Sequence, residues 1–514
     1  MALRTAVQLT GENLTIHDVW AVAVDRAPAA LSEAARDKIV RARELVERAA
    51  HGTNEHTYGI NTGFGRFVSH SIPEELTAEL QIRLLRSHAC GVGEPYPDEV
   101  VRAAMLLRAN ALAKGFSGAR PQTVELLVEC LNRGVLPHVP SRGSVGASGD
   151  LAPLAHLALP LVGEGEAWVD GARMAGAAAL DAAGLEPIVL EAKEGLSLVN
   201  GTQFMAAFAS LALARARRLA KAADVACAMS VEALQGSRTS FLPQIHASRP
   251  LPGQIDSAAN LLDLLEGSAI IESHRWCDKV QDAYSLRCAP QVHGASRDLL
   301  AYGAATVSVE LNAATDNPLV LVDDELLVSN GNFHGQPLAF ALDTLAMAVS
   351  ELANISERRM ERLVNPSLSE GLPPFLTVDG GLNSGFMIPQ YVAAALVSEN
   401  KALCHPASVD SIPTSAGQED HVSMGNAAGL KAWQVLANAE RVLAIELLAG
   451  AQAIEFLAPL EPGIGARAAR DAVRVLSPRV SDDRSLSGDI EAVAAAIRDG
   501  SYVAAVELET GELR

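Results

Sequence analysis

Three long stretches rich in alanine and leucine constrain this chain most. They span residues 202–235, 337–364 and 418–457, and only the third is interrupted within, by three glycines. In the second stretch, apolar residues such as Leu338, Leu342 and Leu345 recur at helical spacing. At 1.5 Å per residue each stretch would form a rod roughly 40–60 Å long. Rods this apolar must be covered on several sides, which predicts a central bundle of long helices whose burial is completed by other subunits.

The first 200 residues have a different character. Short apolar runs alternate there with glycine and proline, which indicates medium helices joined by substantial loops, with a little strand around residues 168–174. Aromatic residues make up only 4% of the chain, and this balance favours helices over sheets. The sequence therefore predicts a mainly α protein with a loop-rich N-terminal domain over residues 1–200 and a long-helix bundle with a C-terminal helical layer over residues 201–514.

Charge and cysteine content limit the partners. The net charge is −20, from 41 basic and 61 acidic residues, which argues against binding nucleic acid or an anionic membrane. None of the six cysteines forms a C-x-x-C pair, so we expect buried free thiols in a reducing cytoplasm. The uncharged stretch 195–214 contains several polar residues and is interpreted as a loop entering a buried helix. The histidines form no metal-binding motif, and we expect no catalytic metal.

A glycine-rich turn, residues 143–150, precedes an apolar segment that begins at Leu151. Such turns can cradle phosphate, but this one lacks the Lys-Ser/Thr pair of a P-loop and the downstream acid of a dinucleotide site. It does not match the G-x-S-x-G nucleophile elbow either. By spacing rules alone, a plain flexible loop is the favoured interpretation.

The run Gly146-Ala147-Ser148-Gly149-Asp150-Leu151-Ala152-Pro153-Leu154 resembles the signature of the aromatic amino acid ammonia-lyases, which include histidine, phenylalanine and tyrosine enzymes. Five more blocks resemble this family in the family's order. They are Tyr58–Gly65, Asn200–Gln203, Gln281–Arg287, Asn332–Gly335 and Gln418–Met424. The resemblance implies the long-helix fold of the fumarase/aspartase-like superfamily. It also implies a homotetramer in which three subunits supply each site.

In this family, Ala-Ser-Gly cyclises without help to a 4-methylidene-imidazol-5-one group. The resemblance assigns this precursor role to Ala147, Ser148 and Gly149, with no external cofactor. The residue types suit the reaction, because the amide nitrogen of Gly149 must reach the carbonyl carbon of Ala147 and only small residues allow so close an approach. Loss of two waters, one involving the Ser148 hydroxyl, would leave an electron-poor methylene.

The resemblance also implies roles for side chains. Tyr58 resembles the general base that removes the substrate β-proton, which requires a pKa below the usual value near 10. Arg287 resembles the clamp on the substrate carboxylate, since its planar fork matches two oxygens, and Gln281 lies near the same end. Tyr284 and Asn200 resemble partners of the prosthetic group and the substrate amine, and Phe333 resembles the residue packed beside the prosthetic ring.

Two positions bear on the substrate. The family's histidine enzymes usually carry Ser-His where this chain has Ser87-His88, and Glu where this chain has Glu419. Both positions are of the histidine type, which implies conversion of L-histidine to trans-urocanate and ammonia in histidine degradation. A pocket offering His88 and Glu419 could satisfy both imidazole nitrogens, whereas a phenyl ring would leave those groups unpaired at a cost of about 1–3 kcal/mol each.

Departures from the family pattern keep alternatives open. The chain has Ala283 where many histidine enzymes have proline, and His293 where methionine is common; His293 could lie behind the site or be structural. A phenylalanine or tyrosine ammonia-lyase, or a 2,3-aminomutase on the same scaffold, shares most of these motifs. A non-catalytic helical scaffold is the alternative outside enzymes, and the retained Ala147-Ser148-Gly149, Tyr58 and Arg287 argue against it.

Overall fold

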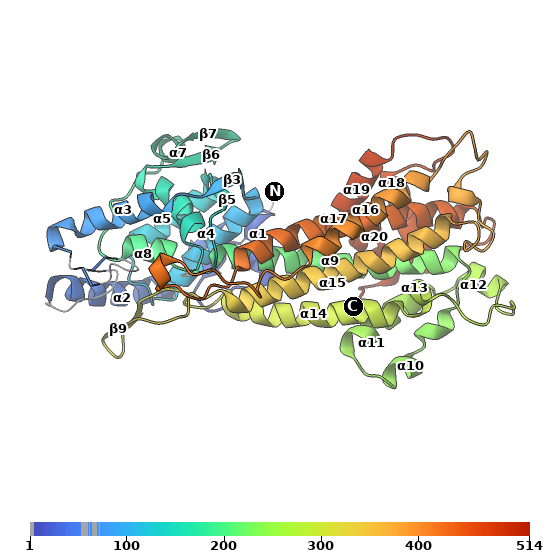
Figure 1. The fold of residues 1–514 in the computed structure, drawn as a ribbon, viewed down its shortest axis with the longest axis horizontal. Helices are drawn as coiled ribbons and strands as arrows, with labels where there is room; N and C mark the ends of the chain where they lie inside the picture. The colour runs from blue at the N-terminus through green and yellow to red at the C-terminus, as the bar shows by residue number, and fades with distance from the viewer. Residues whose placement is uncertain (1–4, 53–59, 61, 64–68, 71, 147–148) are drawn as a thin grey trace. The chain divides into compact units, whose positions relative to one another are not determined.

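Four long helices dominate the chain (Figure 1): α9 (Gln203–Ala233), α14 (Ala289–Glu310), α15 (Gln336–Val364) and α17 (Gly425–Glu455). The computed structural model describes residues 5–514, except 53–59, 61, 64–68, 71 and 147–148. It is mainly helical, as the sequence predicts. Three of the long helices match the three alanine- and leucine-rich stretches. However, α17 begins seven residues later than expected, and α14 was not expected.

The chain divides into two compact units. Unit 1 consists of Met1–Leu211, Ala304–Asp343 and Pro406–Leu430, and unit 2 of Ala212–Gly303, Thr344–His405 and Lys431–Arg514. Unit 1 thus contains all of residues 1–200, the expected N-terminal domain, together with later parts of the chain. Each long helix contributes residues to both units.

Unit 1 combines short helices with small sheets. Its helices are α1 (Ile16–Ala23), α2 (Glu33–Gly52), α3 (Thr77–His88), α4 (Asp98–Ala113), α5 (Pro121–Asn132), α6 (Leu151–Ala158), α7 (Gly176–Ala182) and α8 (Glu194–Val199). Its strands are β1 (Val7–Leu9), β2 (Ala29–Leu31), β3 (Val92–Pro95), β4 (Leu136–Pro137), β5 (Pro140–Arg142), β6 (Glu166–Val169), β7 (Ala172–Ala175), β8 (Leu319–Leu321) and β9 (Leu326–Val328).

The strands of unit 1 pair as β1–β2, β3–β5, β4–β6–β7 and β8–β9, and only the first pair is parallel. The expected strand around residues 168–174 is the hairpin β6–β7. Its two-residue turn, Asp170-Gly171, has positive φ at both positions, which matches the twist of the flanking strands.

Unit 2 consists of helices around the long-helix segments. Besides those segments it contains α10 (Pro243–Ala247), α11 (Pro252–Leu264), α12 (Ala269–Ser273), α13 (Tyr284–Arg287), α16 (Met387–Leu403), α18 (Ile464–Leu476), α19 (Ser487–Asp499) and α20 (Ser501–Thr510). Leu219 and Val225 of α9 and Val442 of α17 are fully buried in this unit. Arg215 of α9 also makes two 2.9 Å hydrogen bonds to Glu440 of α17. The prediction that these helices are covered on several sides is confirmed.

Two further expectations can be compared with the fold. Within the stretch 195–214, residues 195–199 belong to α8 and only 200–202 form a loop before the buried start of α9, so the expected loop is much shorter than predicted. By length and composition, α15 could span a membrane, but 67% of its most apolar window is buried inside the protein, as in a core helix. All six cysteines are free, yet only Cys130 and Cys227 are buried, so the expectation of uniformly buried thiols is wrong.

Candidate active site

The glycine-rich turn packs directly against the loop that leads into α9. Gly149 has φ +76° and forms an isolated bridge with Gly201, while the amide of Asp150 donates to the Gly201 carbonyl at 2.7 Å. A Cβ added to Gly149 would lie 2.0 Å from that carbonyl oxygen. Only glycine fits this position, both for its backbone conformation and for space. Ala147 and Ser148 lie outside the described residues.

The carboxylate of Asp150 joins this turn to the first turn of α9. It accepts hydrogen bonds from the amides of Phe204 at 2.9 Å and Met205 at 3.0 Å, and from the Ser144 hydroxyl at 2.8 Å. A carboxylate at this end of a helix satisfies free amides and complements the helix dipole. Burial nevertheless raises the pKa of Asp150 to about 6. Asp150 stands in the motif, but no role was predicted for it; its place between the glycine-rich turn and an apolar helix was the available signal.

Two more motif blocks reach the same turn. The Ser423 hydroxyl donates to the Gly146 carbonyl at 3.2 Å, and the amide of Met424 donates to the Val145 carbonyl at 2.9 Å. The amide of Gly335 also points to the Gly146 carbonyl, at 3.5 Å. Four of the six motif blocks therefore meet around residues 145–150.

Asn200 is buried at the end of α8. Its Nδ2 donates to the Asn317 carbonyl at 3.0 Å, while its Oδ1 has no hydrogen-bond partner among the described residues. Arg108, fully buried in α4, donates through Nη1 to the Asn200 carbonyl at 2.6 Å and to Oε1 of Gln203 at 3.0 Å. The unpaired oxygen suits contact with a donor such as an amine. Arg108 was not predicted as a site residue, although a lone charge within the apolar run 105–113 indicates a buried arginine with a polar partner.

His88 is the last residue of α3, and its hydrogen bonds fix its tautomer. Nδ1 lies 2.9 Å from the Leu84 carbonyl oxygen, which can only accept, so the neutral ring carries its proton on Nδ1 and Nε2 offers a lone pair. Burial lowers the pKa of His88, while the Leu84 carbonyl and the nearby Glu419 carboxylate oppose this shift. The neutral imidazole is therefore an acceptor toward the pocket.

Glu419 is held in the loop before α17 rather than in the helix. It pairs with Thr414 through two backbone hydrogen bonds, and its Oε2 accepts from the Thr414 hydroxyl at 2.7 Å. Its carboxylate opposes the lowering of the pKa of His88. Both groups present acceptors, which differs from the donor-and-acceptor pair expected from the sequence. Phe333 is half-buried in the turn before Gly335, in the same unit.

The three remaining residues lie together in unit 2. Arg287 donates through Nη2 to Oε1 of Gln281 at 2.8 Å and through Nε to the Asp282 carbonyl at 3.0 Å. Its guanidinium lies 4.7 Å from the centre of the Tyr284 ring, which is itself 72% exposed. Gln281 and Arg287 line a cavity of about 910 Å³ that is rich in basic side chains. Arg238, Arg275 and Lys279 in this lining are paired with carboxylates, so Arg287, which forms no ion pair among the described residues, is the cation available to an anionic group.

The structure therefore assembles two groups of expected residues. Unit 1 holds His88, Gly149, Asn200, Phe333 and Glu419, and unit 2 holds Gln281, Tyr284 and Arg287. Tyr58 lies outside the described residues. Within the described part of the chain, no group of three or more His, Cys, Asp or Glu side chains could hold a metal ion.

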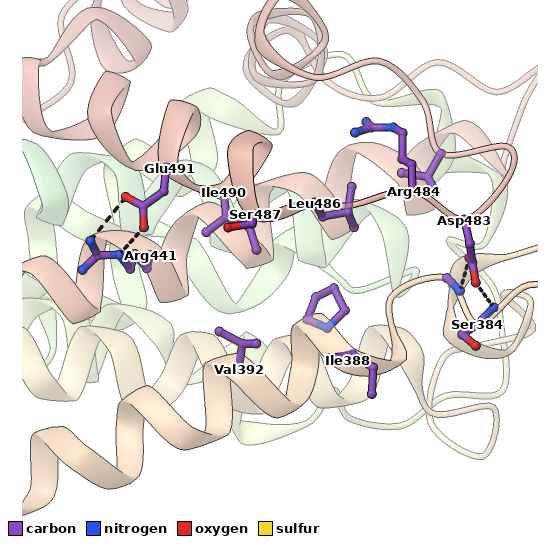
Figure 2. Close-up of a pocket in the computed structure, with 13 residues that line it drawn as sticks. Ser384, Ile388, Val392, Arg441, Asp483, Arg484, Leu486, Ser487, Ile490 and Glu491 are labelled. Carbon is purple, nitrogen blue, oxygen red and sulfur yellow. Dashed lines mark hydrogen bonds and ion pairs between the residues drawn. The ribbon is translucent and has the colours of Figure 1, made fainter.

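A second cavity in unit 2, of about 610 Å³, lies among α16, α17 and α19 (Figure 2). Ile388, Val392 and Ile490 form apolar walls, and Arg441 is paired with Glu491 at 2.7 Å. The Asp483 carboxylate accepts the amides of residues 384 and 385. The cavity contains none of the expected site residues, and these charged groups already have partners, so we do not assign the reaction to it.

Comparisons with known proteins agree with the motif blocks. The family model described as aromatic amino acid lyase matches residues 14–475. A histidine ammonia-lyase of Gloeobacter violaceus is 58% identical over 505 residues, 98% of each chain, and one of Myxococcus xanthus is 54% identical over 99% of each chain.

Two solved structures show the same fold. The histidine ammonia-lyase of Trypanosoma cruzi has a TM-score of 0.91 and 46% identity, covering 99% of this chain and 96% of its own. A tyrosine aminomutase of Streptomyces globisporus has a TM-score of 0.94 and 39% identity, covering 99% of this chain and all of its own.

Proposed function

We propose that this chain removes ammonia from L-histidine without oxidation and releases trans-urocanate. The premise is that the chain belongs to the aromatic amino acid lyase family. The chain is a carbon–nitrogen lyase of histidine degradation. The observation that carries this conclusion is the end-to-end identity of 58% to a curated histidine ammonia-lyase, over 98% of each chain.

The ring of the substrate is recognised by His88 and Glu419. Nε2 of His88 and the Glu419 carboxylate both accept hydrogen bonds, so they suit a ring that carries an N–H group. An imidazole offers such a donor, whereas a phenyl ring offers none and would leave the Nε2 lone pair of His88 without a hydrogen-bond donor from the substrate. This difference in the hydrogen bonds that the ring can donate is the physical basis for preferring histidine over phenylalanine.

Ala147, Ser148 and Gly149 form the 4-methylidene-imidazol-5-one group, and no external cofactor is needed. The described residues fit this group, because a Cβ at Gly149 would overlap the Gly201 carbonyl and the turn is fixed by Asp150 at the start of α9. When formed, the group supplies an electrophilic methylene that no standard side chain offers. The buried, unpaired Oδ1 of Asn200 is available to the substrate amine.

The chain's own residues bind the substrate and move its proton. Arg287, oriented by Gln281 and by the ring of Tyr284, binds the carboxylate with its planar guanidinium. Tyr58 removes the proton from the β-carbon, and Tyr284 and Phe333 complete the surroundings of the prosthetic group.

The active assembly is a homotetramer with shared sites in the cytoplasm. Several large apolar side chains of the long helices and α16 remain exposed in the single chain, among them Val309 at 72%, Phe340 at 45% and Tyr391 at 62%. Apolar faces of this kind are typical of obligate subunit interfaces.

The experiment that tests the function is an assay of the purified protein against L-histidine, L-tyrosine and L-phenylalanine, with the products identified by mass spectrometry. We expect urocanate and ammonia from histidine, seen also as a rise in near-ultraviolet absorbance. A β-amino acid product would instead assign an aminomutase, the activity named for the Streptomyces globisporus structure. No turnover of any of the three would overturn the proposal.

A further inference from the structure

His293, which departs from the family pattern, lies at a junction of all four long helices in unit 2. Its Nδ1 is 2.7 Å from Oδ1 of Asp224 in α9, and its Nε2 is 3.4 Å from Nη1 of Arg359 in α15. Arg359 in turn binds Glu446 of α17 through Nε and Nη2. All four side chains are fully buried.

The partners of His293 determine its protonation. A guanidinium can only donate, so Nε2 of His293 is an acceptor and Nδ1 carries the proton that is donated to Asp224. Burial lowers the pKa of His293, in keeping with a neutral ring. Asp224 does not depend on this ring alone, because it also accepts from Ser257 at 2.6 Å and from Arg297 at 2.6 Å.

Arg359 connects this buried group to the substrate-binding segment. Besides His293, its Nη1 reaches the carbonyl oxygen of Ser285 at 3.4 Å. Ser285 stands in α13, a helix of only four residues that begins with Tyr284 and ends with Arg287. A single helical turn has little stability of its own and depends on tertiary contacts. The guanidinium is thus held from two sides, by Glu446 and by His293, while it contacts the backbone of α13.

We propose that His293 and Arg359 are positioning residues for carboxylate binding: Arg359, oriented by His293, holds the Ser285 carbonyl and thereby fixes Tyr284 and Arg287. This inference rests on the proposed function, in which Arg287 binds the substrate carboxylate. Positioning of this kind changes affinity for one part of the substrate, because the guanidinium must meet two oxygens in a set geometry. A merely structural role would weaken all ligands or the fold itself.

The test compares His293→Met with His293→Gln in the full-length protein. Both side chains are unbranched and similar in volume, but only glutamine keeps an acceptor for Arg359. Asp224 retains its other donors in both variants, so both are expected to fold. We expect His293→Met to raise KM for histidine on the order of fivefold with kcat little changed, and His293→Gln to stay within about twofold of the parent protein.

Two competitive probes isolate the carboxylate. Imidazole-4-propionate carries the ring and the carboxylate, and histamine carries the ring and the amine without a carboxylate. We expect His293→Met to weaken inhibition by imidazole-4-propionate about fivefold and to leave inhibition by histamine unchanged. Equal weakening of both, or of neither, would overturn the positioning role. Absence of histidine turnover in the unsubstituted protein would instead overturn the proposed function, so the two failures are distinguishable.

Discussion

At the scale of single residues, the site depends on which groups are left with free hydrogen-bonding capacity. His88 has its proton committed to the Leu84 carbonyl, and Asn200 keeps an oxygen without a partner among the described residues. Motif resemblance named both residues from the sequence. It could not show which atom of His88 faces a ligand, because the tautomer follows from a backbone carbonyl four residues earlier in α3.

The double substitution Glu419→Gln with His88→Phe tests recognition of the substrate ring. The change removes a carboxylate and an imidazole acceptor, so kcat/KM for histidine should fall by roughly 10²-fold or more. Steady-state kinetics with histidine and phenylalanine would measure the effect, with circular dichroism as the control for folding. Unchanged histidine turnover would show that these positions do not contact the ring.

Ser148→Ala tests the origin of the electrophile. Alanine has no hydroxyl to lose, so we expect nearly all turnover to vanish while the fold is kept. Intact-mass spectrometry provides the second measurement: the unsubstituted chain should weigh two waters less than its sequence, and the variant should not show this deficit. Activity close to that of the unsubstituted chain would rule out a prosthetic group formed from this residue.

At the scale of secondary-structure elements, the sequence predicted helix bounds best where glycine and proline are rare. The helix α9 contains no glycine or proline and α15 contains only Pro337, in its first turn, and both helices match the predicted bounds within a few residues. The helix α14 was missed because Pro290, Gly294 and Gly303 fall within it; the proline lies in the first turn, where it is tolerated. The start of α17 was misplaced because residues 418–424 make other contacts. Glu419 pairs with Thr414, and Ser423 and Met424 bind the glycine-rich turn.

The buried carboxyl group of Glu232, near the end of α9, gives a pH prediction. Glu232 accepts from the Ser268 hydroxyl at 2.6 Å and from the amide of Gly463 at 2.8 Å, but burial raises its pKa to about 7. A raised pKa stabilises the folded state at low pH, and this contribution is lost as pH rises from about 4.5 to about 7. The loss is on the order of 3 kcal/mol.

Glu232→Gln should remove this dependence, since glutamine is neutral throughout; its carbonyl oxygen can accept from the Gly463 amide, and its NH2 group can donate to the Ser268 hydroxyl. We expect the variant and the unsubstituted protein to have similar thermal midpoints at pH 5, and the variant to have the higher midpoint at pH 8. Thermal unfolding followed by circular dichroism at the two pH values measures the difference. Parallel curves for the two proteins would show that Glu232 does not titrate in this range.

At the scale of the whole molecule, composition predicted the helical class correctly, and the exposed apolar side chains of the long helices suit the proposed tetramer. The division of the chain into two compact units was harder to predict from the sequence. Composition changes after residue 200, where α9 begins, whereas contacts group residues 304–343 and 406–430 with the N-terminal part of the chain. Local composition carries no information about contacts between stretches a hundred or more residues apart.

Co-expression of the Ser148→Ala chain with the Tyr58→Phe chain tests the shared site. Each variant alone should be inactive. If the two residues of a site come from different subunits, random mixing restores both intact residues in about a quarter of sites. A urocanate assay of the purified mixed assembly measures this fraction. A tetramer without rescue would place Tyr58 and Ser148 in one subunit, and a fully active monomer would contradict sharing altogether.

The interleaving of the two units has an evolutionary consequence. Four of the five boundaries between them fall inside α9, α14, α15 and α17. Neither unit could be gained or lost as a cassette through gene fusion or recombination, because any such exchange would cut a continuous helix. New specificities on this scaffold are therefore expected to arise by changes within the units, such as point substitutions, rather than by exchange of a whole unit. The end-to-end alignment with both an ammonia-lyase of histidine and an aminomutase of tyrosine is the pattern that this mode of descent leaves.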